Sequence, residues 1–260
     1  MALEQLDSTA APEDTDSIQA PDIGGPSFMP LDGGETFEYT LASNSFGHYC
    51  VPVDLADTKE AVSVTAAAVP ELSTVGLICR KMGKGDLITG STGFGAFLPA
   101  FHEALSANAM IHGFEPTETA FGAASFTTRL NGLENVNLHN VIAGKRARDF
   151  PKARLVDRNP EDEKAIGPVS FVEMKKLDTI VPQGRYVSVI HLKSYSMEMP
   201  ALLGAKRIVQ DCAPLLVMKA PRTRTQRFFL SCLQAHFPDL KYQFAGVMDE
   251  NAIFVPLNRT

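Results

Sequence analysis

The segment Gly85-Asp86-Leu87-Ile88-Thr89-Gly90-Ser91-Thr92-Gly93-Phe94-Gly95 predicts a strand that enters a turn of small residues and then a helix. Glycines let the backbone pass close to a ligand, and the N-terminus of a helix offers unpaired N–H groups to an anion. Glu115 follows Gly95 by twenty residues, at the end of the next expected strand. A carboxylate there can accept hydrogen bonds from ribose hydroxyls. Together the turn and the acid predict a site for a nucleoside-containing cofactor.

Outward from this turn, apolar segments of strand length alternate with longer amphipathic segments, which is typical of parallel βαβ units. The pattern predicts an α/β, Rossmann-like fold: a mostly parallel sheet with helices on both faces. A C-terminal pair, 242–247 and 252–256, joined by a short polar loop, predicts an antiparallel hairpin at the sheet edge. The other expected elements are strands 86–90, 110–114, 136–143, 186–192 and 214–219 and helices 94–106, 118–130, 198–211 and 225–237.

Three regions precede or interrupt this pattern. Residues 1–36 are rich in Asp, Glu, Pro, Gly, Ser and Thr and are expected to form a disordered acidic leader. Residues 37–84 are expected to form an N-terminal cap, with helical structure interrupted at Pro70, before the main domain at 85–260. The charged stretch 144–167 is expected to be a mobile surface insertion.

Composition narrows the classes of partner. The net charge is −6, but residues 1–58 hold eleven acidic residues and no Lys or Arg, so the remainder carries about +5. These positive charges are scattered, so nucleic acid is not expected as a partner. The four cysteines form no CxxC pair, so we expect free thiols and no metal site. No signal peptide or membrane span is evident, and the expected location is the cytoplasm.

The turn also looks like the start of the short-chain dehydrogenases, so an NAD(P)-dependent oxidoreductase is an alternative. That family uses a Tyr four residues before a Lys to transfer a proton. None of the five tyrosines has a Lys at that offset, and the turn lies about 90 residues into the chain. The dehydrogenase is therefore the weaker alternative.

Several motifs in order resemble the FkbM methyltransferase family, over about 47–255 of this chain. The residues that carry the resemblance are Gly85-Asp86, Thr92-Gly93-Phe94-Gly95, Phe97-Leu98-Pro99-Ala100, Gly113-Phe114-Glu115-Pro116, Leu130-Asn131-Gly132-Leu133-Glu134-Asn135-Val136, Leu138-His139-Asn140, Leu177-Asp178-Thr179-Ile180-Val181-Pro182, Ala201-Leu202-Leu203-Gly204-Ala205 and Pro214-Leu215-Leu216-Val217.

The resemblance implies a class I methyltransferase sheet and S-adenosylmethionine as cofactor. It implies methyl transfer to a hydroxyl of a small molecule or glycan. The turn Thr92, Gly93, Phe94 and Gly95 would pass the methionine part, Glu115 would hold the ribose, and Asn140 to Ala143 would lie near the adenine.

The chain departs from the family after the fourth strand. The family usually has a segment like Ile-Lys-Ile-Asp-Val-Glu-Gly, whereas this chain has Lys193 and Tyr195 in place of the two acids. An ammonium at this place would repel the sulfonium of the cofactor. It would act as a base only if burial depressed its pKa. His191, which lies mid-strand, is the other candidate base.

The expected catalytic residues are therefore His191, Lys193 and Tyr195. A rival from another class is a catalytically inactive pseudo-methyltransferase that serves as a binding or partner subunit. Assembly as a homo-oligomer, or pairing with an active homologue, would fit that role.

Overall fold

The computed structural model describes residues 27–30, 36–91, 93–151, 171–193 and 196–258. Its strands are β1 Ser27–Pro30, β2 Thr36–Asn44, β3 Gly47–Pro52, β4 Asp86–Gly90, β5 Ile111–Phe114, β6 Val136–His139, β7 Ile142–Ala143, β8 Arg148–Pro151, β9 Phe171–Lys175, β10 Val187–Leu192, β11 Leu215–Lys219, β12 Gln243–Met248 and β13 Asn251–Val255. Its α-helices are α1 Lys59–Thr65, α2 Leu72–Met82, α3 Leu98–Glu103, α4 Glu118–Leu130, α5 Leu177–Ile180, α6 Glu198–Leu203, α7 Lys206–Cys212 and α8 Thr223–His236.

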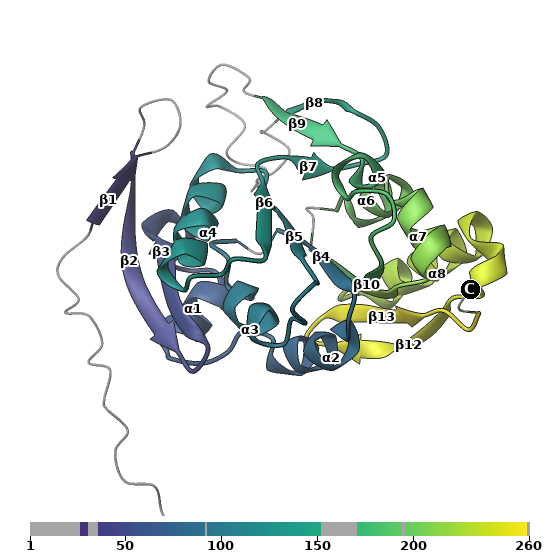
Figure 1. The fold of residues 1–260 in the computed structure, drawn as a ribbon, viewed down its shortest axis with the longest axis horizontal. Helices are drawn as coiled ribbons and strands as arrows, with labels where there is room; N and C mark the ends of the chain where they lie inside the picture. The colour runs from purple at the N-terminus through teal and green to yellow at the C-terminus, as the bar shows by residue number, and fades with distance from the viewer. Residues whose placement is uncertain (1–26, 31–35, 92, 152–170, 194–195, 259–260) are drawn as a thin grey trace, which may run out of the picture.

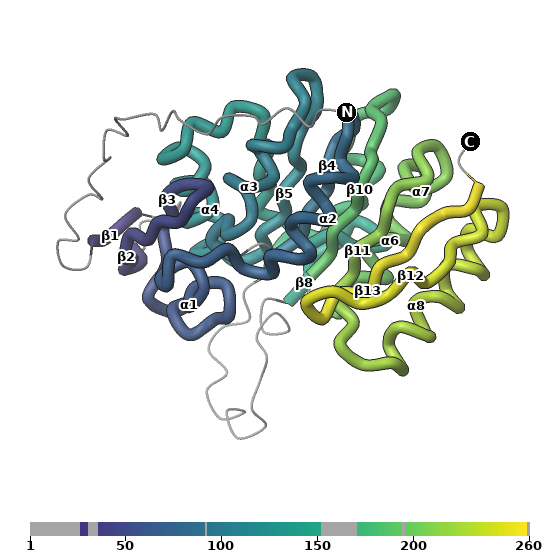
Figure 2. The backbone as a smooth tube through the Cα atoms, turned by 90° about the horizontal axis from the view of Figure 1, so that it is seen from below, coloured from purple at the N-terminus to yellow at the C-terminus, as the bar shows by residue number. Residues whose placement is uncertain are grey.

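A seven-stranded sheet with the order β12-β13-β11-β10-β4-β5-β6 runs through the molecule (Figures 1 and 2). Its strands from β11 to β6 are parallel, whereas β13 runs antiparallel to both β11 and β12. The edge strand β12 is mostly exposed, and its register shifts between Phe244 and Gly246. The expected mixed sheet with its C-terminal hairpin is confirmed.

Alternating strand residues bury the two faces of the sheet under different helices. Ile88, Ile190 and Leu216 belong to the core beneath α5 to α8. Their sequence neighbours Leu87, Val189 and Val217 belong to a second core beneath α2 and α3. Because both faces of the central strands are apolar, the sheet is covered on both sides, as parallel sheets require.

The N-terminal strands β1, β2 and β3 form a separate sheet that packs on α4 (Figure 1). Asn131 fixes this contact, since its side chain accepts from the His48 N–H at 2.8 Å and donates to the His48 carbonyl at 2.6 Å. The strand over Ser27–Pro30 corrects the prediction of a disordered leader up to residue 36, because it pairs with β2. Residues 1–26 lie outside the described part of the chain.

Two further predicted elements were wrong in extent, each for a local reason. The strand expected over 136–143 ends at His139, because the Asn140 side chain turns to donate to the carbonyls of Glu115 and Thr117. The remainder of the expected strand, β7, pairs with β9 in a small sheet that also contains β8. Of these three strands, β8 lies within the stretch 144–167 that was expected to be a mobile insertion. The helix expected from Phe94 begins only at Leu98, since Gly93 and Gly95 have positive φ.

The helix expected over 198–211 is divided into α6 and α7. A Cβ at Gly204, between them, would lie 2.1 Å from the carbonyl oxygen of Gly144, so the two backbones touch there. The Asp178 carboxylate then accepts hydrogen bonds from the N–H groups of Arg207 at 2.8 Å and Ile208 at 3.1 Å. These bonds satisfy the free N–H groups of a new helix start.

Asp86 anchors the amino end of the sheet, where its buried carboxylate accepts hydrogen bonds from three residues on two segments. The donors are Nε of Arg185 at 2.8 Å, Nε2 of His112 at 3.3 Å and the Met110 N–H at 2.9 Å. Burial alone would raise the pKa of Asp86, but the hydrogen bonds from His112 and Arg185 outweigh it and hold the pKa at about 2. The ionised carboxylate therefore stabilises the fold.

We expect Asp86→Asn to lower the free energy of unfolding by about 2 kcal/mol at pH 7. Since the folded pKa of Asp86 lies below the ordinary value, its contribution is present above about pH 4 and is lost as pH falls toward 2. Urea denaturation followed by circular dichroism across that range should show the difference between wild type and variant shrinking with acid. The exposed Asp211→Asn serves as control, and an equal loss in both variants would contradict the prediction.

Candidate functional site

The carboxyl ends of four parallel strands bring the predicted site residues to one edge of the sheet. Gly90 pairs with Phe114 on one side and with Leu192 on the other, so the residues after them are neighbours. The Ser91 N–H donates to the Phe114 carbonyl at 2.8 Å, and the Lys193 N–H donates to the Gly90 carbonyl at 3.3 Å. The glycine turn, Glu115 and Lys193 therefore start from adjacent backbone positions.

The turn after β4 has a left-handed backbone conformation that residues with a Cβ rarely adopt. Gly93 and Gly95 have φ of +66° and +81°. A Cβ at Gly95 would lie 3.1 Å from Leu98 Cδ1 and 3.2 Å from the Cα of Ala124, whereas no atom of the described residues lies within 4 Å of one at Gly93. Gly95 is thus required by packing against α4, and Gly93 leaves open space beside the backbone. Phe94, between them, is buried against Tyr49 and does not line that space.

We expect Gly95→Ala to lower the free energy of unfolding more than Gly93→Ala, because only the first adds a close contact to the strained φ. A left-handed residue with a Cβ costs about 1–2 kcal/mol, and the Gly95 variant should lose more than that. Gly132, with φ of +59° and open space, is the matched control and should behave like Gly93. Thermal and urea denaturation of the three variants measure the order, and equal losses at Gly93 and Gly95 would contradict it.

Glu115 lies directly after β5, and its side chain is fully buried. Its N–H donates to the His139 carbonyl at 3.0 Å, and its carbonyl accepts from Asn140 Nδ2 at 3.2 Å. Asn140 also lines a cavity of about 530 Å³ together with Glu118 and Phe121 of α4. The acid expected to hold the ribose and the residue expected near the adenine are therefore neighbours.

Of the other predicted site residues, one lies away from this group and two are not described. Ala143, on β7, is buried in the core under α5 to α8 and pairs with Lys175 of β9. Thr92 and Tyr195 lie outside the described residues. The structure thus brings together Gly93, Gly95, Glu115 and Asn140 among the residues proposed for the cofactor.

Lys193 is buried at the end of β10, where two carboxylates surround its ammonium. Glu60 of α1 and Glu71, which precedes α2, both accept hydrogen bonds from Nζ, and the ammonium lies 5.0 Å above the Phe97 ring. Asn251 of β13 donates to Glu71 at 2.8 Å. Burial alone would lower the pKa of Lys193, but the charges of Glu71 and Glu60 outweigh it and raise it. The condition under which Lys193 would act as a base is not met.

His191 lies two residues before Lys193, on the same face of β10. Its ring packs edge-on against Phe97 and Phe101, and Nδ1 lies 3.1 Å from the Thr89 hydroxyl. Burial, and then the charge of Lys193, lower the pKa of His191 to about 3. The imidazole is therefore neutral at physiological pH and a weak base.

The two glutamates and Asn251 were missed in the sequence. Glu60 and Glu71 lie more than 120 residues before Lys193, in a region expected only to form a cap. A buried lysine needs counter-charges, but the sequence does not show which acids supply them.

We expect Lys193→Met to lower the free energy of unfolding by about 3 kcal/mol at pH 7, because it leaves two carboxylates without their cation. Burial alone would raise the pKa of Glu60, but the favourable interactions, chiefly the charge and hydrogen bond of Lys193, together outweigh burial and the pKa is lowered. The stabilisation by this ion pair is therefore present above about pH 4.5 and is lost as pH falls. The difference between wild type and variant should therefore shrink on acidification.

The control for this variant is Lys59→Met, which removes an exposed ion pair to Glu250 at 3.0 Å. Exposed pairs contribute less than about 1 kcal/mol. Chemical denaturation at pH 4 and pH 7 compares the Lys193 variant with the Lys59 variant, and each variant with wild type at the two pH values. A Lys193 variant as stable as the Lys59 variant at pH 7 would refute the role of the buried cluster.

The described part of the chain has neither a cluster of metal-binding side chains nor a membrane-spanning helix. No group of three or more His, Cys, Asp or Glu side chains is gathered there to hold a metal ion. No helix among the described residues is long and apolar enough to cross a bilayer.

Comparison with solved structures defines the class of the fold. A methyltransferase FkbM from Methylobacillus flagellatus KT superposes with a TM-score of 0.51 at 14% identity, over 66% of this chain and 43% of that one. The chain therefore spans less than half of that protein. Its sheet order and antiparallel hairpin are those of the Rossmann-like methyltransferase fold. No protein-family model matches the chain, and no curated protein matches it.

Weaker likenesses extend to other methyltransferases. A precorrin-6y C5,15-methyltransferase from Geobacter metallireducens gives a TM-score of 0.44 at 13% identity, over 72% of this chain and 88% of that one. A tRNA (uracil-54, C5)-methyltransferase from Pyrococcus abyssi, in complex with S-adenosyl-L-homocysteine, gives 0.46 at 10%, over 84% and 43%. The expected restriction to a small-molecule or glycan partner, with nucleic acid excluded, was wrong, since this tRNA enzyme is among the similar structures.

Proposed function

We propose that the protein binds S-adenosylmethionine at the carboxyl edge of β4 and β5 and transfers its methyl group to an oxygen acceptor. The observation that carries the proposal is the Glu115 carboxylate at the end of β5, beside a turn held by the bond from Ser91 to Phe114. When bound, the cofactor supplies an electrophilic methyl group on a positive sulfonium. The chain supplies a carboxylate for the ribose and a glycine backbone for the methionine part.

The backbone at Gly93 and the charges around Lys193 support the binding of such a cofactor. The open space at Gly93 lets a ligand approach the backbone. The ammonium of Lys193 is accompanied by two carboxylates, so the cluster carries a net charge of −1 and its repulsion of a sulfonium is offset. Because Glu115 is fully buried, the ribose reaches it only after neighbouring groups shift.

The roles of the three proposed catalytic residues follow from their surroundings. Lys193 stays protonated and serves as a fixed cation that orients the site. His191 stays neutral and supports Lys193 through the shared Phe97 contact. A contact of Tyr195 with the acceptor stays a proposal from the sequence, as does a contact of Thr92 with the cofactor.

A second candidate function is a pseudo-methyltransferase that keeps the fold as a binding or partner subunit. The buried Lys193 cluster favours this function. Its hydrogen bonds connect α1, the start of α2 and β13 through Glu60, Glu71 and Asn251. The cluster lies at the strand end where the FkbM resemblance implies acids. A junction of this kind contributes to stability with or without catalysis.

Calorimetric titration with S-adenosylmethionine, S-adenosylhomocysteine and NADPH separates these functions. Micromolar binding of the first two supports the methyl donor site. Binding of none of the three supports the pseudo-methyltransferase, and binding of NADPH alone would overturn the proposal in favour of an oxidoreductase. Transfer is then measured with a donor carrying a labelled methyl group, followed into RNA, glycan and small-molecule fractions.

If Glu115 holds the ribose, Glu115→Gln should weaken donor binding at least tenfold, because the amide replaces one of two acceptor oxygens with a donor. The exposed Glu134→Gln is the matched control and should bind like wild type. Circular dichroism of both variants shows whether the fold is kept. Equal donor affinity in wild type and the Glu115 variant would contradict the assignment.

A further inference from the structure

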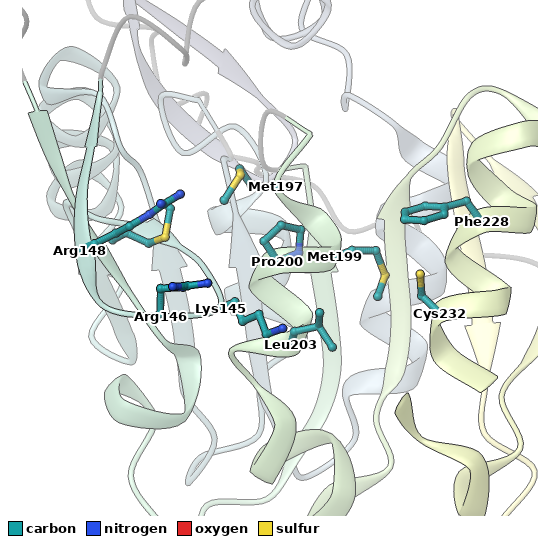
Figure 3. Close-up of a pocket in the computed structure, with 10 residues that line it drawn as sticks. Lys145, Arg146, Arg148, Met197, Met199, Pro200, Leu203, Phe228 and Cys232 are labelled. Atoms are coloured by element: carbon teal, nitrogen blue, oxygen red, sulfur yellow. The ribbon is translucent and has the colours of Figure 1, made fainter. Parts of the chain in front are cut away.

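A groove of about 390 Å³ crosses α6 between the segment before β8 and helix α8 (Figure 3). Its volume lies in the range of about 300–1,000 Å³ that is usual for small-molecule sites. Neither Gly93, Glu115 nor Lys193 lines it. The groove is therefore separate from the proposed cofactor site.

Three basic residues surround one end of the groove, whose lining is mostly apolar. Lys145, Arg146 and Arg148 line it, and Figure 3 shows Lys145 and Arg146 reaching toward α6. All three side chains are exposed, no acidic residue is among the described residues that line the groove, and none of the described residues forms an ion pair with them. Two guanidinium groups and an ammonium at one end of a groove match a dianionic phosphate, which arginine binds through paired hydrogen bonds.

The other end is apolar. Met199 and Leu203 of α6 form its middle, and Phe228 of α8 closes it (Figure 3). Phe228 is 57% exposed, on a helix whose buried residues are Phe229 and Leu233. Methionine side chains adapt to irregular apolar ligands, so this surface suits a flexible alkyl chain.

We propose that this groove binds a free single-chain lipid phosphate, with its phosphate at Lys145, Arg146 and Arg148 and its alkyl chain along Met199, Leu203 and Phe228. The polarity along the groove carries this inference, since a cationic end and an apolar end within one groove match an anionic head and an apolar tail. Binding requires no methyl donor, so it is independent of the proposed methyl transfer.

The probe is dodecyl phosphate below its micellar concentration, titrated into the full chain by calorimetry. Butyl phosphate should bind at least about 100-fold more weakly, because each buried methylene adds affinity. Dodecyl trimethylammonium should not bind. Equal affinity for the cationic and anionic amphiphiles would overturn the proposal, as would binding to phosphatidylglycerol vesicles without binding to monomeric dodecyl phosphate.

Variants test the two ends separately. Arg146→Glu with Arg148→Glu should weaken dodecyl phosphate at least tenfold, and Phe228→Ala should weaken it while leaving butyl phosphate unchanged. The matched controls, Arg222→Glu and Phe244→Ala, alter exposed residues outside the groove and should bind like wild type. Undiminished affinity in the double Arg variant would overturn the proposal.

Methyl NMR of the methionines gives a readout that does not depend on any variant. Dodecyl phosphate should shift the signals of Met174, Met197 and Met199, which line the groove. It should leave Met82 unchanged, because that residue is buried under the other face of the sheet. Shifts at Met82 alone, or none at the three groove methionines, would refute this location.

Discussion

The Lys193 ammonium and its two carboxylates form the contact on which the site side of the molecule depends. A lysine buried at a strand end is expensive unless its charge is matched, and Glu60 and Glu71 match it from segments that precede the whole parallel sheet in sequence. Through Asn251 the same cluster reaches the antiparallel hairpin. The N-terminal helices are therefore not an independent addition, because the central sheet relies on them to neutralise one of its own residues.

This arrangement changes the meaning of the substitution at the end of β10. In the sequence, an ammonium in place of an acid reads as a loss, since it would repel a sulfonium by about 4 kcal/mol at about 4 Å before screening. In the folded protein two acids from α1 and the loop before α2 lie beside this ammonium. This edge of the sheet therefore carries a net negative charge although the residue at the strand end is a lysine.

The sequence predicted those parts of the fold that local pattern determines. Strand 86–90 and helix 118–130 have the predicted bounds, because turn residues and clear periodicity delimit them. The breaks at Asn140 and Gly204 could not be predicted, since each depends on contacts with distant backbone. In the site, Glu115 and the glycine turn followed from spacing along the chain. The partners of Lys193 did not, because ion pairs between residues over 120 positions apart leave no local signal.

The irregular edge at β12 has a consequence for how the protein behaves in a crowded solution. A straight edge strand offers a row of unpaired N–H and C=O groups that can template the strand of another molecule. In β12 the register shift between Phe244 and Gly246 interrupts that row, next to the exposed Val247 and Met248. A bulge twists and kinks its strand, so a second molecule cannot pair along its full length. The same bulge that disturbs the hairpin thus protects the apolar edge from aggregation.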